Sequence, residues 1–130
     1  AKTGLTSFIA NVKSVTLDKN TSEQKVEITD SSSDNFPLRY TNTMVSDKKS
    51  DKSIQEINLI DMNPKSVKIK VSGKKIMVEF LTNYQEKIIK TYKNGDIKSY
   101  TYKVLLYADT VENARELKSL LTQVITKIKK

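Results

Sequence analysis

The clearest local signals in the chain lie in residues 92–125, which read YKNGDIKSYTYKVLLYADTVENARELKSLLTQVI. Asn94-Gly95 lies between two strand-like runs, and both residue types accept the positive φ angles of a type I′ hairpin turn. A two-residue turn would pair the flanking strands as Lys93 with Asp96 and Ile89 with Tyr100. The first half of the stretch therefore predicts a tight antiparallel hairpin.

The second half of the stretch predicts a long helix. Asp109 and Glu112 have the D-x-x-E spacing of a capping box, in which each side chain bonds to a backbone N–H at the start of a helix. Apolar residues then recur at helical spacing, at Val111, Ala114, Leu117, Leu121, Val124 and Ile128. We expect an amphipathic helix over about residues 110–128, with its apolar stripe against a sheet.

Upstream of the hairpin, short segments with alternating apolar residues predict further strands. These segments are residues 25–29, 38–40, 54–60, 67–71 and 76–80, separated by polar turns. Residues 15–17 also read as extended. We expect Ser46–Ser53 to be a mobile hairpin tip. A short helix is predicted from a cap at Thr6 or Ser7 to about Ser14.

This order of elements predicts the fold class. A short helix, six or seven antiparallel strands and a terminal helix do not alternate as a parallel sheet requires. The prediction is an α+β fold in which a bent antiparallel sheet of six or seven strands is packed by a long C-terminal amphipathic helix. At 130 residues the chain is expected to form a single domain, residues 1–130.

The composition excludes most catalytic chemistry. The chain has no Cys and no His, which removes thiolate chemistry, the usual zinc sites and the usual catalytic triads. It has only three Gly and no glycine-rich phosphate loop. Asp18 to Ser22 begins like a calcium loop, but Glu23 stands where that loop needs Gly. The sequence predicts a protein that is not an enzyme and has no catalytic residue, cofactor or metal.

Three features bear on location. The longest apolar run, residues 104–108, is far shorter than the roughly 20 residues that a membrane span needs. The chain begins at Ala1 and not at Met, so we expect that a segment was removed, either an expression leader or a signal peptide. The cysteine-free, polar and lysine-rich composition is compatible with export and favours an extracytoplasmic location, periplasmic or secreted.

Residues 54–128 resemble the second half of a pleckstrin-homology-like (PH-like) domain of the bacterial type. The resemblance lies in EINLIDMNPKSVKIKVSGKKIMVEFLT, with a strand ending in the turn Leu59 to Pro64, and in the helix opening Asp109 to Ala114. It implies a strongly bent antiparallel sheet closed at one end by the C-terminal helix. It also implies a non-enzymatic adaptor or ligand-binding module.

The net charge of +8 lies in the second half of the chain. Residues 66–130 hold 14 basic and 6 acidic side chains, whereas residues 1–65 hold 9 of each. Alternation within VKIKV is typical of the solvent face of a half-buried strand. The alternative is that the strands of residues 66–103 bind an anion. The candidate anion-binding residues are Lys68, Lys70, Lys74, Lys75, Lys90 and Lys93.

Tyrosines between these lysines would strengthen nucleic-acid binding by stacking on bases. Tyr100 and Tyr102, however, share a face with Val104 and Leu106, so we expect them in the core.

Three functions stay open at this point. The first is a binding module for an unidentified protein partner. The second is a binder of polyanions or anionic membrane surfaces through residues 66–103. The third is a carrier of a small apolar ligand, which requires a deep apolar pocket.

Overall fold

The computed structural model describes residues 2–129, with side chains from residue 4 onward. Two α-helices, three short 3₁₀ helices and nine strands make up this part of the chain. The predicted α+β class is confirmed, but the number of strands exceeds the six or seven expected. In chain order they are α1 (Lys2–Ala10), β1 (Val15–Leu17), β2 (Asn20–Ile28), β3 (Pro37–Val45), β4 (Ser50–Asn58), β5 (Lys68–Ser72), β6 (Lys75–Leu81), β7 (Ile89–Lys93), β8 (Asp96–Thr101), β9 (Lys103–Ala108) and α2 (Val111–Ile128).

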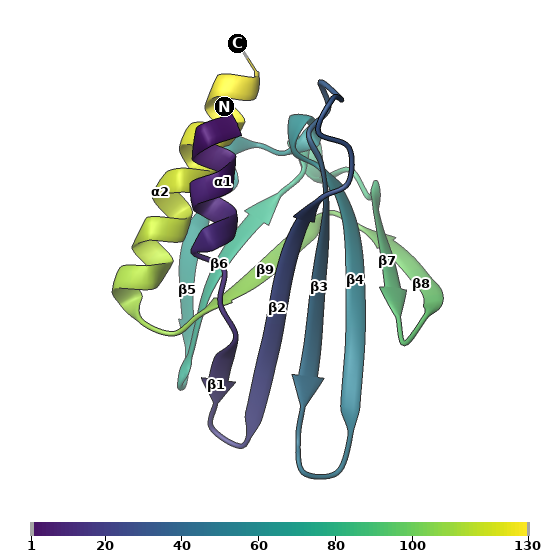
Figure 1. The fold of residues 1–130 in the computed structure, drawn as a ribbon, viewed down its shortest axis with the longest axis vertical. Helices are drawn as coiled ribbons and strands as arrows, with labels where there is room; N and C mark the ends of the chain where they lie inside the picture. The colour runs from purple at the N-terminus through teal and green to yellow at the C-terminus, as the bar shows by residue number, and fades with distance from the viewer. Residues whose placement is uncertain (1, 130) are drawn as a thin grey trace.

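The strands form two antiparallel sheets and not one. The larger sheet has the order β1-β2-β3-β4-β7-β8, and the smaller has the order β5-β6-β9 (Figure 1). The two helices lie side by side across the open side between the sheets. A single apolar core fills the interior, with contributions from both sheets and both helices: Leu5, Phe8, Val26, Leu38, Ile57, Val78, Phe80, Val104, Leu106, Leu117, Leu121 and Ile125, among others.

The predicted terminal helix is confirmed. Its apolar stripe is buried against the three-stranded sheet and α1. The predicted cap at Asp109 is wrong: the N-cap is Thr110, whose hydroxyl accepts a hydrogen bond from the Asn113 N–H at 3.0 Å. The Asn113 side chain in turn accepts from the Asp109 N–H at 3.3 Å. The cap therefore lies one residue later than predicted, at Thr110, and the side chain of Asn113 bonds back to the N–H of the residue before it.

The N-terminal helix lies earlier than predicted, over Lys2–Ala10, so Thr6 and Ser7 are inside it and are not caps. It ends where the Asn11 side chain donates to the Ser7 carbonyl at 2.9 Å, which satisfies a last-turn acceptor. A Cβ added at Gly4 would lie 3.0 Å from Val124 of α2. The close packing of the two helices accounts for a glycine inside α1.

Two strand boundaries differ from the prediction. The pairing of β3 with β4 begins where Pro37 lies opposite Asn58 and ends where Val45 lies opposite Ser50. The hairpin tip, expected over residues 46–53, is therefore only Ser46–Lys49. Polar residues at Ser50 to Ser53 form a strand because one face is open to solvent and the partner strand supplies the backbone bonds. At the other end, Leu59–Asp61 is a 3₁₀ turn and not the end of a strand.

The Asn94-Gly95 hairpin is confirmed, with φ angles of 50° and 90° at the two turn residues. Lys93 pairs with Asp96 as predicted. The prediction for Ile89 is wrong, because a bulge beside Tyr92 shifts the register and Ile89 pairs with Thr101. The bulge also leaves Tyr100 55% exposed, so the expectation that it lies in the core is wrong.

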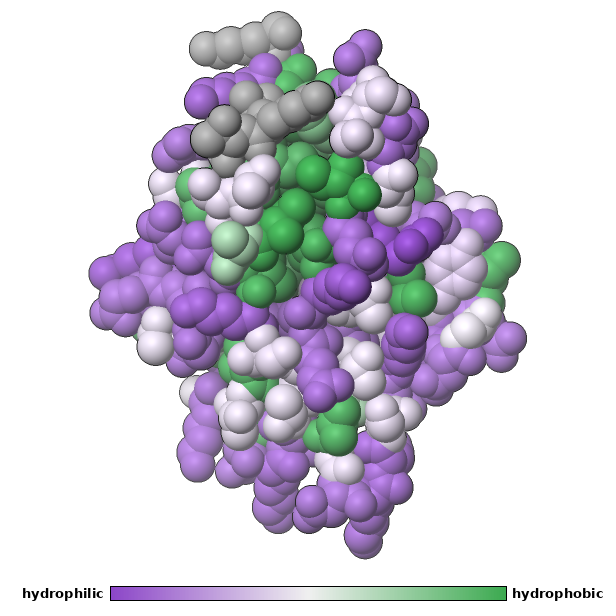
Figure 2. Space-filling model, in the orientation of Figure 1, coloured by the Kyte–Doolittle hydropathy of each residue, from purple (hydrophilic) through white to green (hydrophobic). Residues whose placement is uncertain are grey.

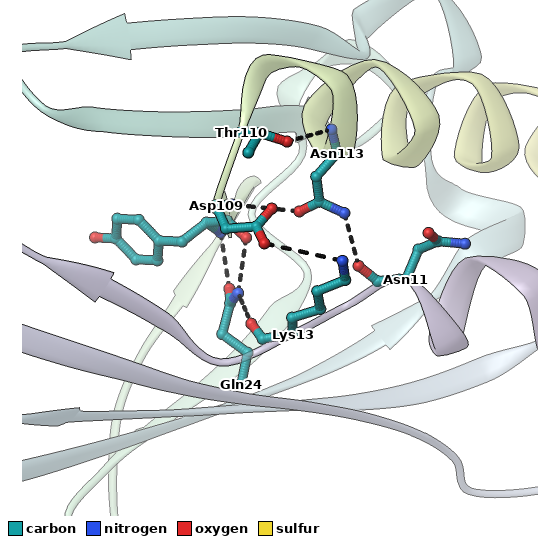
Figure 3. Close-up of polar contacts among 7 residues, drawn as sticks. Asn11, Lys13, Gln24, Asp109, Thr110 and Asn113 are labelled. Carbon is teal, nitrogen blue, oxygen red and sulfur yellow. Dashed lines mark hydrogen bonds and ion pairs between the residues drawn. The ribbon is translucent and has the colours of Figure 1, made fainter.

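Gln24, on the inner face of β2, joins the two sheets (Figure 3). Its amide donates to the carbonyls of Tyr107 and Lys13 at 2.7 and 2.8 Å, and its oxygen accepts from the Tyr107 N–H at 2.8 Å and the Tyr40 hydroxyl at 2.5 Å. Gln55 donates likewise to the Lys103 carbonyl at 3.1 Å. These bonds occupy part of the free edge of β9, which pairs on its other side with β6.

Candidate functional site

The six candidate anion-binding lysines do not form one surface. Lys68 and Lys70 lie on β5 of the three-stranded sheet, and Lys74 and Lys75 lie at the β5–β6 turn. Lys90 and Lys93 lie on β7 of the other sheet, three residues apart and therefore on opposite faces. The structure thus brings together only the four lysines of the β5–β6 hairpin.

Lys68 and Lys70 are both engaged by one buried carboxylate. Glu79 of β6 is 3% exposed, and its two oxygens lie 3.5 Å from the Lys68 amine and 2.7 Å from the Lys70 amine. Burial raises the pKa of Glu79, but the bonds and charges of Lys70 and Lys68 outweigh it, so the pKa lies below the ordinary value. Because Glu79 compensates much of their charge, these two lysines are poor candidates for binding an external anion.

A second group of lysines gathers where three turns meet at one end of the molecule. The β1–β2 turn adjoins the β5–β6 turn in one shallow pocket and the β3–β4 turn in another. We name this group the turn-end lysines: Lys19, Lys48, Lys49, Lys74 and Lys75. Exposed ion pairs of Lys74 with Asp18 at 3.7 Å and Lys49 with Asp51 at 3.8 Å offset part of their charge. This end of the molecule is hydrophilic in Figure 2.

The outer edge of β5 is open. β5 pairs with β6 alone, and the tight turn at Gly73-Lys74 closes on the pair Ser72–Lys75. Bonded residues alternate along an antiparallel pair, so the N–H and C=O groups of Ile69 and Val71 point away from β6. Within residues 2–129, no other element bonds to them. Val71 is also 63% exposed.

A groove of about 430 Å³ lies between β5 and one flank of α2. Its lining is Ile69 from the strand and Arg115, Lys118, Ser119, Thr122 and Gln123 from the helix. The helical residues recur every three or four positions, so they form one stripe beside the buried stripe. The Thr122 hydroxyl oxygen is buried and has no hydrogen-bond partner. An open strand edge, an apolar side chain and two cations therefore lie together.

The other strand edges are less open. On the edge of β9, Gln24 bonds to the backbone N–H and C=O of Tyr107, and Gln55 bonds to the C=O of Lys103. β1 has three residues, and β8 is interrupted by the bulge. Short edges and bulges are recognised ways in which proteins prevent unwanted strand pairing. β5 is the edge on which a regular ladder could continue.

No family model, curated protein or solved structure matches the chain. Within residues 2–129, no helix is long and apolar enough to cross a membrane. No group of three acidic side chains that could hold a metal ion occurs in this part of the chain either.

A small apolar hollow lies between α1 and the end of β2, where Figure 2 shows a hydrophobic depression. It is lined mainly by Leu5, Ile28 and Phe36 and has a volume of about 120 Å³. Pockets that enclose a drug-sized ligand have volumes of roughly 300–1,000 Å³. The hollow is too small for the deep pocket that a ligand carrier requires.

Exposed aromatic residues also occur on the outer face of the six-stranded sheet. The Lys90 amine lies 5.3 Å from the centre of the Tyr92 ring, and the Tyr92 hydroxyl donates to Glu56 at 2.8 Å. Ile97 and Tyr100 are more than half exposed beside them. Acidic and basic residues alternate across this face at Glu27, Arg39, Glu56 and Lys90, so it has no net preference for an anion.

Sequence reasoning missed Arg115, Lys118 and Thr122 as site residues. Their spacing on the polar flank of α2 was visible, but the strand beside that flank was not. It also missed Lys19, Lys48 and Lys49, because turns distant in sequence meet only in the folded chain.

Proposed function

We propose that the protein is a non-catalytic interaction module that binds an extended segment of a partner protein along β5, beside α2. The observation that carries this proposal is the open edge of β5 next to the groove lined by Ile69, Arg115 and Thr122. In strand addition, backbone hydrogen bonds supply affinity and neighbouring pockets supply specificity. Both requirements are met at this edge.

The alternation of a strand defines how such a segment would lie. Its backbone would bond to the outward groups of Ile69 and Val71. Every second side chain would then point toward α2, over Ile69 and the helical stripe, and the others toward the opposite face. A segment of about five residues would match the length of β5.

The test is selection from a library of displayed linear peptides, followed by NMR mapping of each bound peptide on the whole chain. We expect micromolar binders that shift the amide signals of residues 68–72 and 115–123. Val71→Pro should weaken them at least tenfold, because the proline ring blocks the edge and removes its donor. The ladder with β6 survives in that variant, because the Val71 N–H points outward.

Val71→Ala is the matched control, since it also shortens the side chain but keeps the N–H. We expect it to bind nearly as well as the wild type. Failure of the library to yield a binder, or binders that Val71→Pro leaves unaffected, would refute the proposal.

We also propose that the chain is a divergent member of the PH-like superfold. The support is two antiparallel sheets followed by a C-terminal helix that covers the open side between them. Helix α1 and the hairpin β7–β8, which adds to β4, would be additions to that pattern.

A second candidate function is binding to an anionic surface through the turn-end lysines. Its support is the convergence of Lys19, Lys48, Lys49, Lys74 and Lys75 from three turns. The test is sedimentation with phosphatidylcholine vesicles, with and without phosphatidylserine. Binding that requires phosphatidylserine, falls with salt and is lost in Lys48→Gln/Lys49→Gln would support it. Equal sedimentation with both vesicles would refute it.

A further inference from the structure

The lining of the groove beside β5 includes two cations and no acidic residue, and the inference drawn from this rests on the proposed strand addition. We infer that the segment bound on β5 is acidic, and that Arg115 and Lys118 of α2 bind its carboxylates. The inference concerns the chemical class of the partner segment: an extended peptide with a glutamate or aspartate among the side chains that face α2.

The first support is that the two cations are uncommitted. Arg115 and Lys118 are exposed, and neither forms an ion pair or a hydrogen bond within residues 2–129. Glu112 lies one turn before Arg115 on the same helix, yet no ion pair joins them. No acidic residue lines the groove. Its charge is therefore available to a ligand.

The second support is the contrast with the opposite face of β5. Lys68 and Lys70 point to that face, and the buried Glu79 already pairs with both. A carboxylate there would compete with Glu79, whereas one beside α2 would meet Arg115 and Lys118 without a competitor. An arginine can bind a carboxylate through two parallel hydrogen bonds, which adds specificity to the charge.

The third support is the charge of this half of the chain. Residues 66–130 hold 14 basic and 6 acidic side chains, so the field around the groove attracts an acidic segment before contact. The apolar contribution comes from Ile69, which leaves room for an aliphatic side chain next to the acidic one. An aliphatic and an acidic residue two positions apart would both face α2 and would together satisfy both requirements.

The test uses two capped peptides, acetyl-Val-Glu-Val-Glu-Val-Glu-Val-amide and its counterpart with glutamine in place of glutamate. A shift of register by one residue turns all the glutamates toward α2, so the probe can present them to the groove. Affinities are measured by NMR titration of the whole chain at one fixed, low salt concentration. The protein variants are Arg115→Gln/Lys118→Gln and a control with the same charge loss outside the groove, Lys127→Gln/Lys129→Gln.

We expect the wild type to bind the glutamate peptide roughly fivefold more tightly than the glutamine peptide, as two exposed ion pairs allow. In Arg115→Gln/Lys118→Gln this preference should vanish, so that the two peptides bind with about equal affinity. The control variant should retain most of the preference.

Three other outcomes are possible, and each would overturn one part of the proposal. Equal binding of both peptides to the wild type overturns the acidic preference and leaves the proposed strand addition standing. A preference lost equally in both variants overturns the role of Arg115 and Lys118, because overall charge then explains it. If neither peptide binds at millimolar concentration, the proposed strand addition fails, and the preference fails with it.

Discussion

Replacing Gln24 by leucine is expected to destabilise the fold by about 3 to 4 kcal/mol. The side chain makes four hydrogen bonds, each worth about 1 kcal/mol net. Leucine has a similar volume but leaves both edge groups of Tyr107 and the buried Tyr40 hydroxyl without partners. Lys13 is exposed, so its carbonyl can bond to water in the variant, and this reduces the loss of stability slightly.

The assay is urea unfolding followed by circular dichroism, for a domain expected to have a total stability of about 5–15 kcal/mol. The matched control is Gln55→Leu, which removes one bond to the other end of β9 and should cost about 1 kcal/mol. If Gln24→Leu destabilises the fold no more than Gln55→Leu does, the four bonds of Gln24 do not stabilise the contact between the sheets as proposed.

Three further predictions concern single positions. Thr122→Val should raise the free energy of unfolding by about 1 kcal/mol, because it removes a buried hydroxyl that has no partner; a loss in the same urea assay would contradict this. Gly95→Ala should lower it by about 1 kcal/mol, because alanine adopts a φ of 90° only with strain, and an unchanged midpoint would argue against the turn. Glu79→Gln should cost about 1 kcal/mol at neutral pH, where half-exposed lysines limit the gain from the ion pairs. The folded state lowers the pKa of Glu79, so its contribution is complete above the ordinary value of 4.5 and is lost as pH falls below it. The difference between wild type and Glu79→Gln should accordingly shrink below pH 4.5, and a constant difference would count against the ion pairs.

The features predicted correctly from sequence are those set by local patterns. Asn94-Gly95 defines a turn because few residues accept positive φ, and the stripe of α2 defines its buried face. The ends of helices and strands were less predictable. Asp109 and Thr110 are both good N-cap residues, and Thr110 caps α2 because its hydroxyl accepts from the Asn113 N–H. The side chain of Asn113 is itself held by the Asn11 carbonyl, which follows α1 and is distant in sequence.

Features that depend on which strands become neighbours could not be read from the sequence. Gln24 and Tyr107 are 83 positions apart, and no local pattern indicates that one bonds the backbone of the other. The bulge beside Tyr92 has no clear signal in the residues around it, yet it changes which face Tyr100 occupies. The candidate lysines of residues 68–93 suggested one basic surface, but β5 and β7, which carry four of them, belong to different sheets.

Intermolecular nuclear Overhauser effects with a bound peptide would show whether β5 accepts an added strand beside α2. We expect cross-strand contacts from the peptide backbone to the amide and α protons of Ile69 and Val71, together with side-chain contacts to Thr122. Contacts to β8 or to the turn-end lysines instead, with Ile69 and Val71 unaffected, would contradict strand addition at β5.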